Sequence, residues 1–170
     1  SNAGQLCMSI ERIYVHRDIY DDFLARLIDE VESLKVGVGL GYDHDIGSLI
    51  SQSQLERVSA HVEDAVAHGA TVHTGGRHRP DLGPYVFEPT ILSGVDESMM
   101  LCRGETFGPV VAVYPVDSDD EAIRLANDSD YGLNASVWGS LPHARAVARQ
   151  IEAGSVNINE GFTATWTSHD

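Results

Sequence analysis

Short runs of β-branched and aromatic residues alternate along this chain with segments whose apolar residues recur every three or four positions. The runs predict strands and the periodic segments predict helices, because each element needs an apolar face to reach a core. Predicted strands cover residues 8–15, 70–74, 110–114, 135–138 and 156–158. This alternation is typical of an α/β domain, layered, with a mostly parallel sheet and flanking helices. Because no repeat or break in composition divides the 170 residues, we expect one domain.

Three of the four predicted helices carry recognisable start signals. Asp18 can cap the first helix, Ser118 forms a capping box with Glu121, and Pro142 suits a first helical turn. The second helix is expected from Ser51 onward by its periodicity alone. The helix that begins at Pro142 is expected to run until Gly154. The buried faces of the first two helices are predicted to consist of Ile19, Tyr20, Phe23, Leu24, Leu27, Ile28, Val31 and Leu34, and of Leu55, Val58, Val62, Ala65 and Val66.

The composition is strongly acidic. Eleven Lys and Arg against 26 Asp and Glu give a formal net charge of −15, which would repel a phosphate backbone or an anionic membrane surface. We therefore expect neither nucleic acid nor a membrane as a partner. The longest apolar run, residues 110–116, is far shorter than the ~20 residues of a membrane-spanning helix. Cys7 and Cys102 form neither a disulfide framework nor a CxxC pair, so we expect a reducing, cytoplasmic location.

Two short segments stand out for their chemistry. Cys7 lies immediately before a predicted strand, where a thiol is either a buried structural residue or, as its thiolate, a nucleophile. Glu105 lies in GETFGP (residues 104–109) and is either a solvated carboxylate or a ligand contact. His61 and His68 are expected on the polar face of one helix, and no histidine spacing indicates a metal site. The sequence has no P-loop and no G-x-G-x-x-G phosphate turn.

Taken in order, several segments together resemble the catalytic, C-terminal domain of the aldehyde dehydrogenase superfamily. They are GQLC (residues 4–7) with the strand that follows, DIGSLI (45–50), residues 69–76, YVFEPTIL (85–92), GETFGP (104–109), Asn127 with YGL (131–133), ASV (135–137) and GSVNIN (154–159). Each motif is short, but their order and spacing are similar to those of the family. The resemblance covers roughly residues 4–160.

The resemblance implies roles for several side chains. Cys7 would be the nucleophile whose thiolate attacks an aldehyde carbon to give a thiohemiacetal, which becomes a thioester after hydride transfer to NAD or NADP. The backbone N–H of Cys7 would be one donor to the resulting oxyanion. Glu105 would contact the nicotinamide ribose, and Phe107 the nicotinamide. The residues that would line the aldehyde pocket are Asn159, Phe162 and Ser168.

The chain also departs from the family pattern. Gly104 stands where the family usually has a second acidic residue. The family's nucleotide-binding domain, general-base glutamate and oxyanion-hole asparagine precede the nucleophile, its oligomerisation strand comes later, and this sequence contains none of them. We therefore expect residues 4–170 to be a truncated catalytic domain that is inactive alone. Residues 1–3 (SNA) resemble the remnant of a cleaved expression tag.

The segments after Cys7 and after Asn159 are most similar to succinate-semialdehyde dehydrogenases. The resemblance thus implies a full-length, homo-oligomeric enzyme that oxidises an aldehyde such as succinate semialdehyde, with NAD or NADP bound mainly by another domain. Two alternatives stay open. One is a non-catalytic interaction domain of the same fold, and the other is an aldehyde dehydrogenase that transfers the acyl group to CoA.

Overall fold

The computed structural model describes residues 2–39, 41 and 43–161. The chain forms two compact units, Ser1–Pro115 and Val116–Asp170, and each is described by itself. The first unit holds η1 (Asn2–Gly4), β1 (Arg12–His16), α1 (Arg17–Glu32), α2 (Gln52–Ala67), β2 (Thr71–Thr74), β3 (Thr90–Ser93), α3 (Met100–Arg103) and all but the last residue of β4 (Val110–Val116). The second unit holds α4 (Asp119–Asn127), β5 (Asn134–Val137), α5 (Leu141–Ala148) and β6 (Ser155–Ile158). Within the described ranges, none of these helices is both long and apolar enough to cross a membrane.

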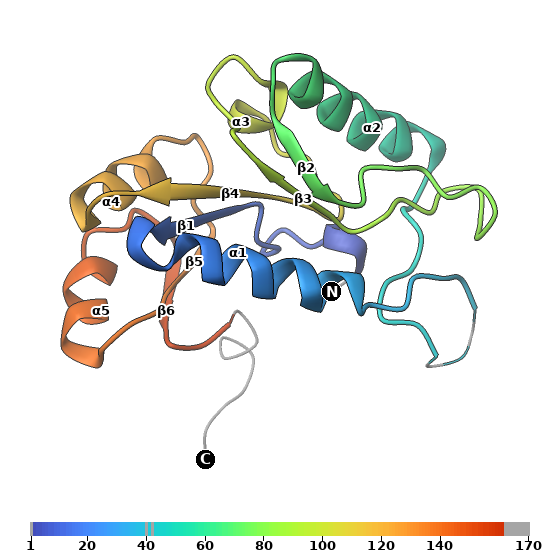
Figure 1. Ribbon diagram of the computed structural model, residues 1–170. Coiled ribbons are helices and arrows are strands. Elements are labelled where there is room, and N and C mark those ends of the chain that lie inside the picture. The colour runs from blue at the N-terminus through green and yellow to red at the C-terminus, as the bar shows by residue number, and fades with distance from the viewer. Residues whose placement is uncertain (1, 40, 42, 162–170) are drawn as a thin grey trace. The chain divides into compact units, whose positions relative to one another are not determined.

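A four-stranded sheet organises the first unit, with the spatial order β1-β4-β3-β2 (Figure 1). β3 pairs with β4 in parallel, and β1 and β4 point the same way in Figure 1. β2 pairs with β3 antiparallel at the edge of the sheet. The predicted α/β class with a mostly parallel sheet and flanking helices is confirmed.

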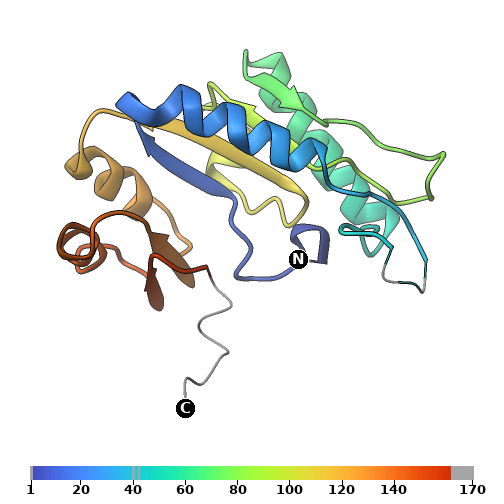
Figure 2. The ribbon, with the colours of Figure 1, turned by 60° about the horizontal axis from the view of Figure 1, so that its bottom comes forward.

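Neighbouring residues of the two central strands point to opposite faces of the sheet, as the pleat requires. On β3, Ile91 belongs to the core cluster that contains α1 residues, whereas Leu92 belongs to the cluster that contains α2 residues. On β4, Val113 and Ala112 divide in the same way. The two helices therefore cover opposite faces of the sheet (Figure 2), which explains why both central strands are apolar without alternation.

The helix starts follow from local hydrogen bonds. Ser118 caps α4 by accepting from the Glu121 amide, as predicted, and Ser51 caps α2 by accepting from the Gln54 amide. The prediction for α1 was wrong, because His16 rather than Asp18 is the capping residue. Asp18 lies in the first turn, where its negative charge favours the positive end of the helix dipole.

In the second unit, β5 and β6 pair in parallel, and α5 connects them. The side chain of Asn127 donates to the carbonyl of Gln150 at 2.8 Å and accepts from the amide of Glu152 at 2.9 Å. These bonds hold the segment after α5 in a non-helical path. The expectation that this helix runs until Gly154 was therefore wrong, and α5 ends at Ala148.

Three burial predictions in the first unit were wrong. Ile19 and Val66 are 59% and 49% exposed, although both were assigned to apolar helix faces. His61 was expected on the polar face of α2 but is buried, because it lies one turn from Val58 on the face that packs against the sheet. Ala3, within the segment expected to be a tag remnant, is also buried and packs in the α2 core cluster.

Candidate active site

Cys7 lies in a turn that precedes β1, and its side chain is exposed. The amide of Ser9 donates to the carbonyl of Leu6 at 2.8 Å, which is why the strand predicted over residues 8–15 begins only at Arg12. The Gln5 side chain accepts from the amide of Ile50 at 2.8 Å and so fixes the start of the turn. The thiol is thus presented to solvent by a segment whose backbone is held in place.

Gly4 brings the cysteine segment into direct contact with GETFGP. Its φ of 73° lies in the left-handed region that favours glycine. A Cβ at this position would lie 1.9 Å from the carbonyl oxygen of Gly108, far inside van der Waals contact. The sequence motif that contains Cys7 and the motif that contains Glu105 therefore lie against each other.

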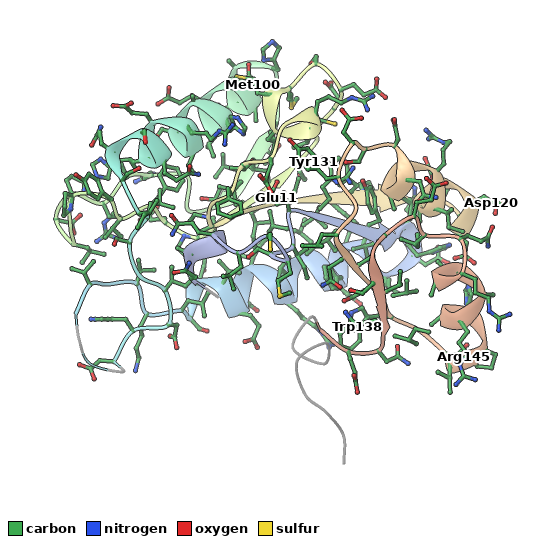
Figure 3. The ribbon with its side chains drawn as sticks, turned by 180° about the vertical axis from the view of Figure 1, so that it is seen from behind. Glu11, Met100, Asp120, Tyr131, Trp138 and Arg145 are labelled. Carbon is green, nitrogen blue, oxygen red and sulfur yellow. The ribbon has the colours of Figure 1, made fainter. Side chains whose placement is uncertain are left out.

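A second contact joins the same two segments, four residues after Cys7. The carboxylate of Glu11, which is labelled in Figure 3, accepts from the amides of Thr106 and Phe107 at 3.1 and 2.8 Å. Thr106 is buried, whereas Glu105 and Phe107 on either side of it are half-buried. The loop thus anchors one side chain in the core and leaves the two predicted cofactor contacts partly accessible.

The electrostatics of the site centre on Glu11. Burial raises the pKa of this carboxyl group, whereas hydrogen bonds from the Phe107 and Thr106 amides lower it, and the nearby charge of Glu105 raises it. The second thiol of the chain, Cys102, is half-buried, and burial raises its pKa. Burial therefore lowers the fraction of the nucleophilic thiolate at Cys102.

The residues predicted to line the aldehyde pocket are placed only in part. Asn159 follows β6 in the second unit, with φ of 56°, and its side-chain oxygen accepts from the amide of Gly139 at 2.8 Å. Phe162 and Ser168 lie outside the described residues. The structure thus brings the segments of Cys7, Glu105 and Phe107 together within the first unit. Among the described residues, no three His, Cys, Asp or Glu side chains are grouped to hold a metal ion.

Two residues that contact the GETFGP loop were missed from the sequence. Glu11 is a lone carboxylate inside the apolar run 8–15, a pattern that signals a buried and hydrogen-bonded charge. Gln54 donates to the carbonyls of Thr106 and Phe107, but a glutamine in the first turn of a helix carries no distinctive signal.

The chain is similar to a known family and to several named proteins. The model of the aldehyde dehydrogenase family matches residues 1–169. A Mycolicibacterium smegmatis protein with the provisional name succinate-semialdehyde dehydrogenase (NADP+) is 53% identical over 169 residues, which are 99% of this chain and 33% of that protein. Succinate-semialdehyde dehydrogenase (NADP+) 2 of Schizosaccharomyces pombe is 41% identical over 160 residues, covering 94% of this chain and 32% of that protein.

A solved structure is similar as well. Betaine aldehyde dehydrogenase from Staphylococcus aureus, in complex with NAD+, superposes with a TM-score of 0.87 and 39% sequence identity over 94% of this chain and 33% of that one. The chain spans about a third of the length of each of these relatives.

Proposed function

This chain belongs to the aldehyde dehydrogenase family, and from that membership we propose that the full natural protein containing it oxidises an aldehyde to the carboxylic acid with NAD or NADP, using Cys7 as the nucleophile. One observation carries the proposal. The exposed Cys7 lies on a segment whose two flanks, Gly4 and Glu11, both contact the loop that bears Glu105 and Phe107. A nucleophile and a cofactor contact must lie close together for hydride transfer from a substrate bound to the cysteine.

The proposed reaction forms and breaks its bonds at Cys7. The thiolate attacks the aldehyde carbon, and the carbonyl oxygen takes up the negative charge, with the backbone N–H of Cys7 as one donor to it. A bound NAD or NADP would supply the acceptor for the hydride that leaves this carbon. Cys7 then carries the acyl group as a thioester, and attack by water releases the acid and restores the thiol.

Glu105 and Phe107 are the residues of this chain proposed to hold the nicotinamide end of the cofactor. A carboxylate can accept hydrogen bonds from ribose hydroxyls, and an aromatic ring can pack against the nicotinamide ring. Both side chains are half-buried, so part of the surface of each is accessible to a ligand. We propose that most of the cofactor is bound by another part of the full protein.

We propose succinate semialdehyde as the aldehyde. This choice is supported by the name of the Mycolicibacterium relative, which is more similar to this chain than the betaine aldehyde dehydrogenase is. Asn159, Phe162 and Ser168 are the proposed pocket residues. We also propose that the full protein is a cytoplasmic homo-oligomer, and its acidic net charge supports the absence of a nucleic-acid partner.

The test uses the full natural protein with succinate semialdehyde and either NAD or NADP. We expect formation of the reduced cofactor together with free succinate, loss of turnover in Cys7→Ala, and retained turnover in the matched control Cys102→Ala. The 170-residue chain alone is expected to give no steady turnover. A full protein that oxidises no aldehyde would favour the non-catalytic interaction domain, and acyl-CoA in place of the acid would favour the CoA-acylating alternative.

A further inference from the structure

Two side chains from different segments form hydrogen bonds to the backbone of the GETFGP loop. Glu11 accepts from both amides of the Thr106–Phe107 pair, and Gln54 donates to both carbonyls of the same pair, at 2.9 and 2.8 Å. All four backbone polar groups of these two residues are therefore bonded to side chains from other segments. We call Glu11 and Gln54 the loop clamp.

The loop needs such support because its conformation is unfavourable. Phe107 has φ of 54°, a region in which a residue with a Cβ is strained. The side chain of Thr106 is buried and lies 3.1 Å from Nδ1 of the buried His61. The strained backbone thus persists because the side chains of Glu11, Gln54 and His61 form hydrogen bonds to Thr106 and Phe107.

The carboxylate of Glu11 is chemically matched to this place. Its two oxygens meet two N–H donors, whereas a glutamine amide would turn an NH2 group toward one of them. The backbone of Glu11 is fixed as well, because its carbonyl accepts from the amide of Ala112 on β4 at 3.0 Å. A half-buried carboxylate is costly unless its oxygens are hydrogen-bonded, and here the loop amides supply those bonds.

We propose that Glu11 is a positioning residue for the cofactor: by holding the Thr106–Phe107 backbone, it sets where Glu105 and Phe107 meet the nicotinamide end relative to Cys7. The proposal rests on the proposed function, in which Glu105 and Phe107 contact the cofactor. Glu11 itself lies four residues after Cys7, so one short segment carries the nucleophile and fixes the loop that the cofactor would meet.

The test compares Glu11→Gln, Glu11→Asp and the matched control Glu63→Gln, an exposed carboxylate on α2, in the full natural protein. In Glu11→Gln we expect the KM for the cofactor that the wild type uses to rise about tenfold, with the KM for the aldehyde unchanged. Hydrogen exchange of the Thr106 and Phe107 amides is expected to speed up by about tenfold. Glu11→Asp keeps both acceptor oxygens and should restore part of each effect, and Glu63→Gln should match the wild type.

The outcomes separate the two proposals. A wild-type protein that oxidises no aldehyde refutes the proposed function and, with it, the positioning role. An active wild type in which Glu11→Gln leaves both the cofactor KM and the amide exchange unchanged refutes the positioning role alone. Where Glu11→Gln does not fold, Glu11→Asp and Gln54→Met, a substitution of similar volume in the other half of the clamp, decide the question by the same two measurements.

Discussion

Replacing Gly4 with alanine tests how tightly the cysteine segment is packed against the GETFGP loop. The added Cβ would lie 1.9 Å from the carbonyl oxygen and 2.4 Å from the carbonyl carbon of Gly108, so the two backbones must separate by about 1.5 Å to regain ordinary contact. Overpacking of this kind costs about 1–3 kcal/mol, and the left-handed backbone adds about 1–2 kcal/mol for a residue with a Cβ. We expect Gly4→Ala to lower the free energy of unfolding by about 2–5 kcal/mol.

Gly69→Ala is the matched control, because Gly69 also has a positive φ, 101°, but no atom within 4 Å of the added Cβ. It should lose only the backbone contribution of about 1–2 kcal/mol. Urea unfolding of the chain, followed by circular dichroism, gives both values from the midpoints if the slopes of the transitions agree. If Gly4→Ala loses no more stability than Gly69→Ala, the two motifs are not in tight contact and our account of the site is wrong.

Three further predictions concern the first unit. Burial, and then the charge of Arg57, lower the pKa of His61 from 6.5, so the unfolded state binds a proton more readily than the folded state. The free energy of unfolding should therefore be highest above about pH 6.5 and fall as the pH decreases below that value. Urea unfolding at several pH values checks this, and His61→Gln should remove the dependence. Leu92→Ala should cost about 2–5 kcal/mol in the same assay, whereas Ile50→Ala, at an 81% exposed position, should stay within about 0.5 kcal/mol, and similar losses would contradict the core assignment. Iodoacetamide should label Cys7 faster than Cys102 at neutral pH, as followed by mass spectrometry, and equal rates would count against an accessible Cys7.

The sequence predicts helices well where apolar residues recur periodically, as after Ser51, or where a capping box marks the start, as at Ser118. It does not predict β3, because this central strand is only four residues long and follows a proline, so no pattern accumulates over its length. The length of α5 is also beyond local reasoning, since Asn127, far away in the sequence, bonds the backbone that would have continued the helix.

In the candidate site, too, local motifs could be predicted from the sequence and long-range contacts could not. Cys7, Glu105 and Phe107 could be chosen by resemblance to a family, because their motifs are local in the sequence. That Glu11 and Gly4 join those motifs depends on tertiary contacts across about a hundred residues, which neither periodicity nor spacing encodes. The burial of two residues that contact the loop did have a signal in the sequence: Glu11 lies in an apolar run, and His61, which contacts Thr106, lies one helical turn from Val58.

The segment around Cys7 is fixed at both ends on a single loop, at Gly4 and again at Glu11. Six residues lie between these two points, and Cys7 is one of them. Replacing an exposed side chain of this six-residue stretch, such as that of Ile10, which is 54% exposed, should leave the path of the backbone unchanged. Adding or removing a residue would change the path of the backbone between Gly4 and Glu11, and the thiol of Cys7 would move with it. For anyone redesigning this protein, the stretch therefore accepts new side chains but has only one permitted length.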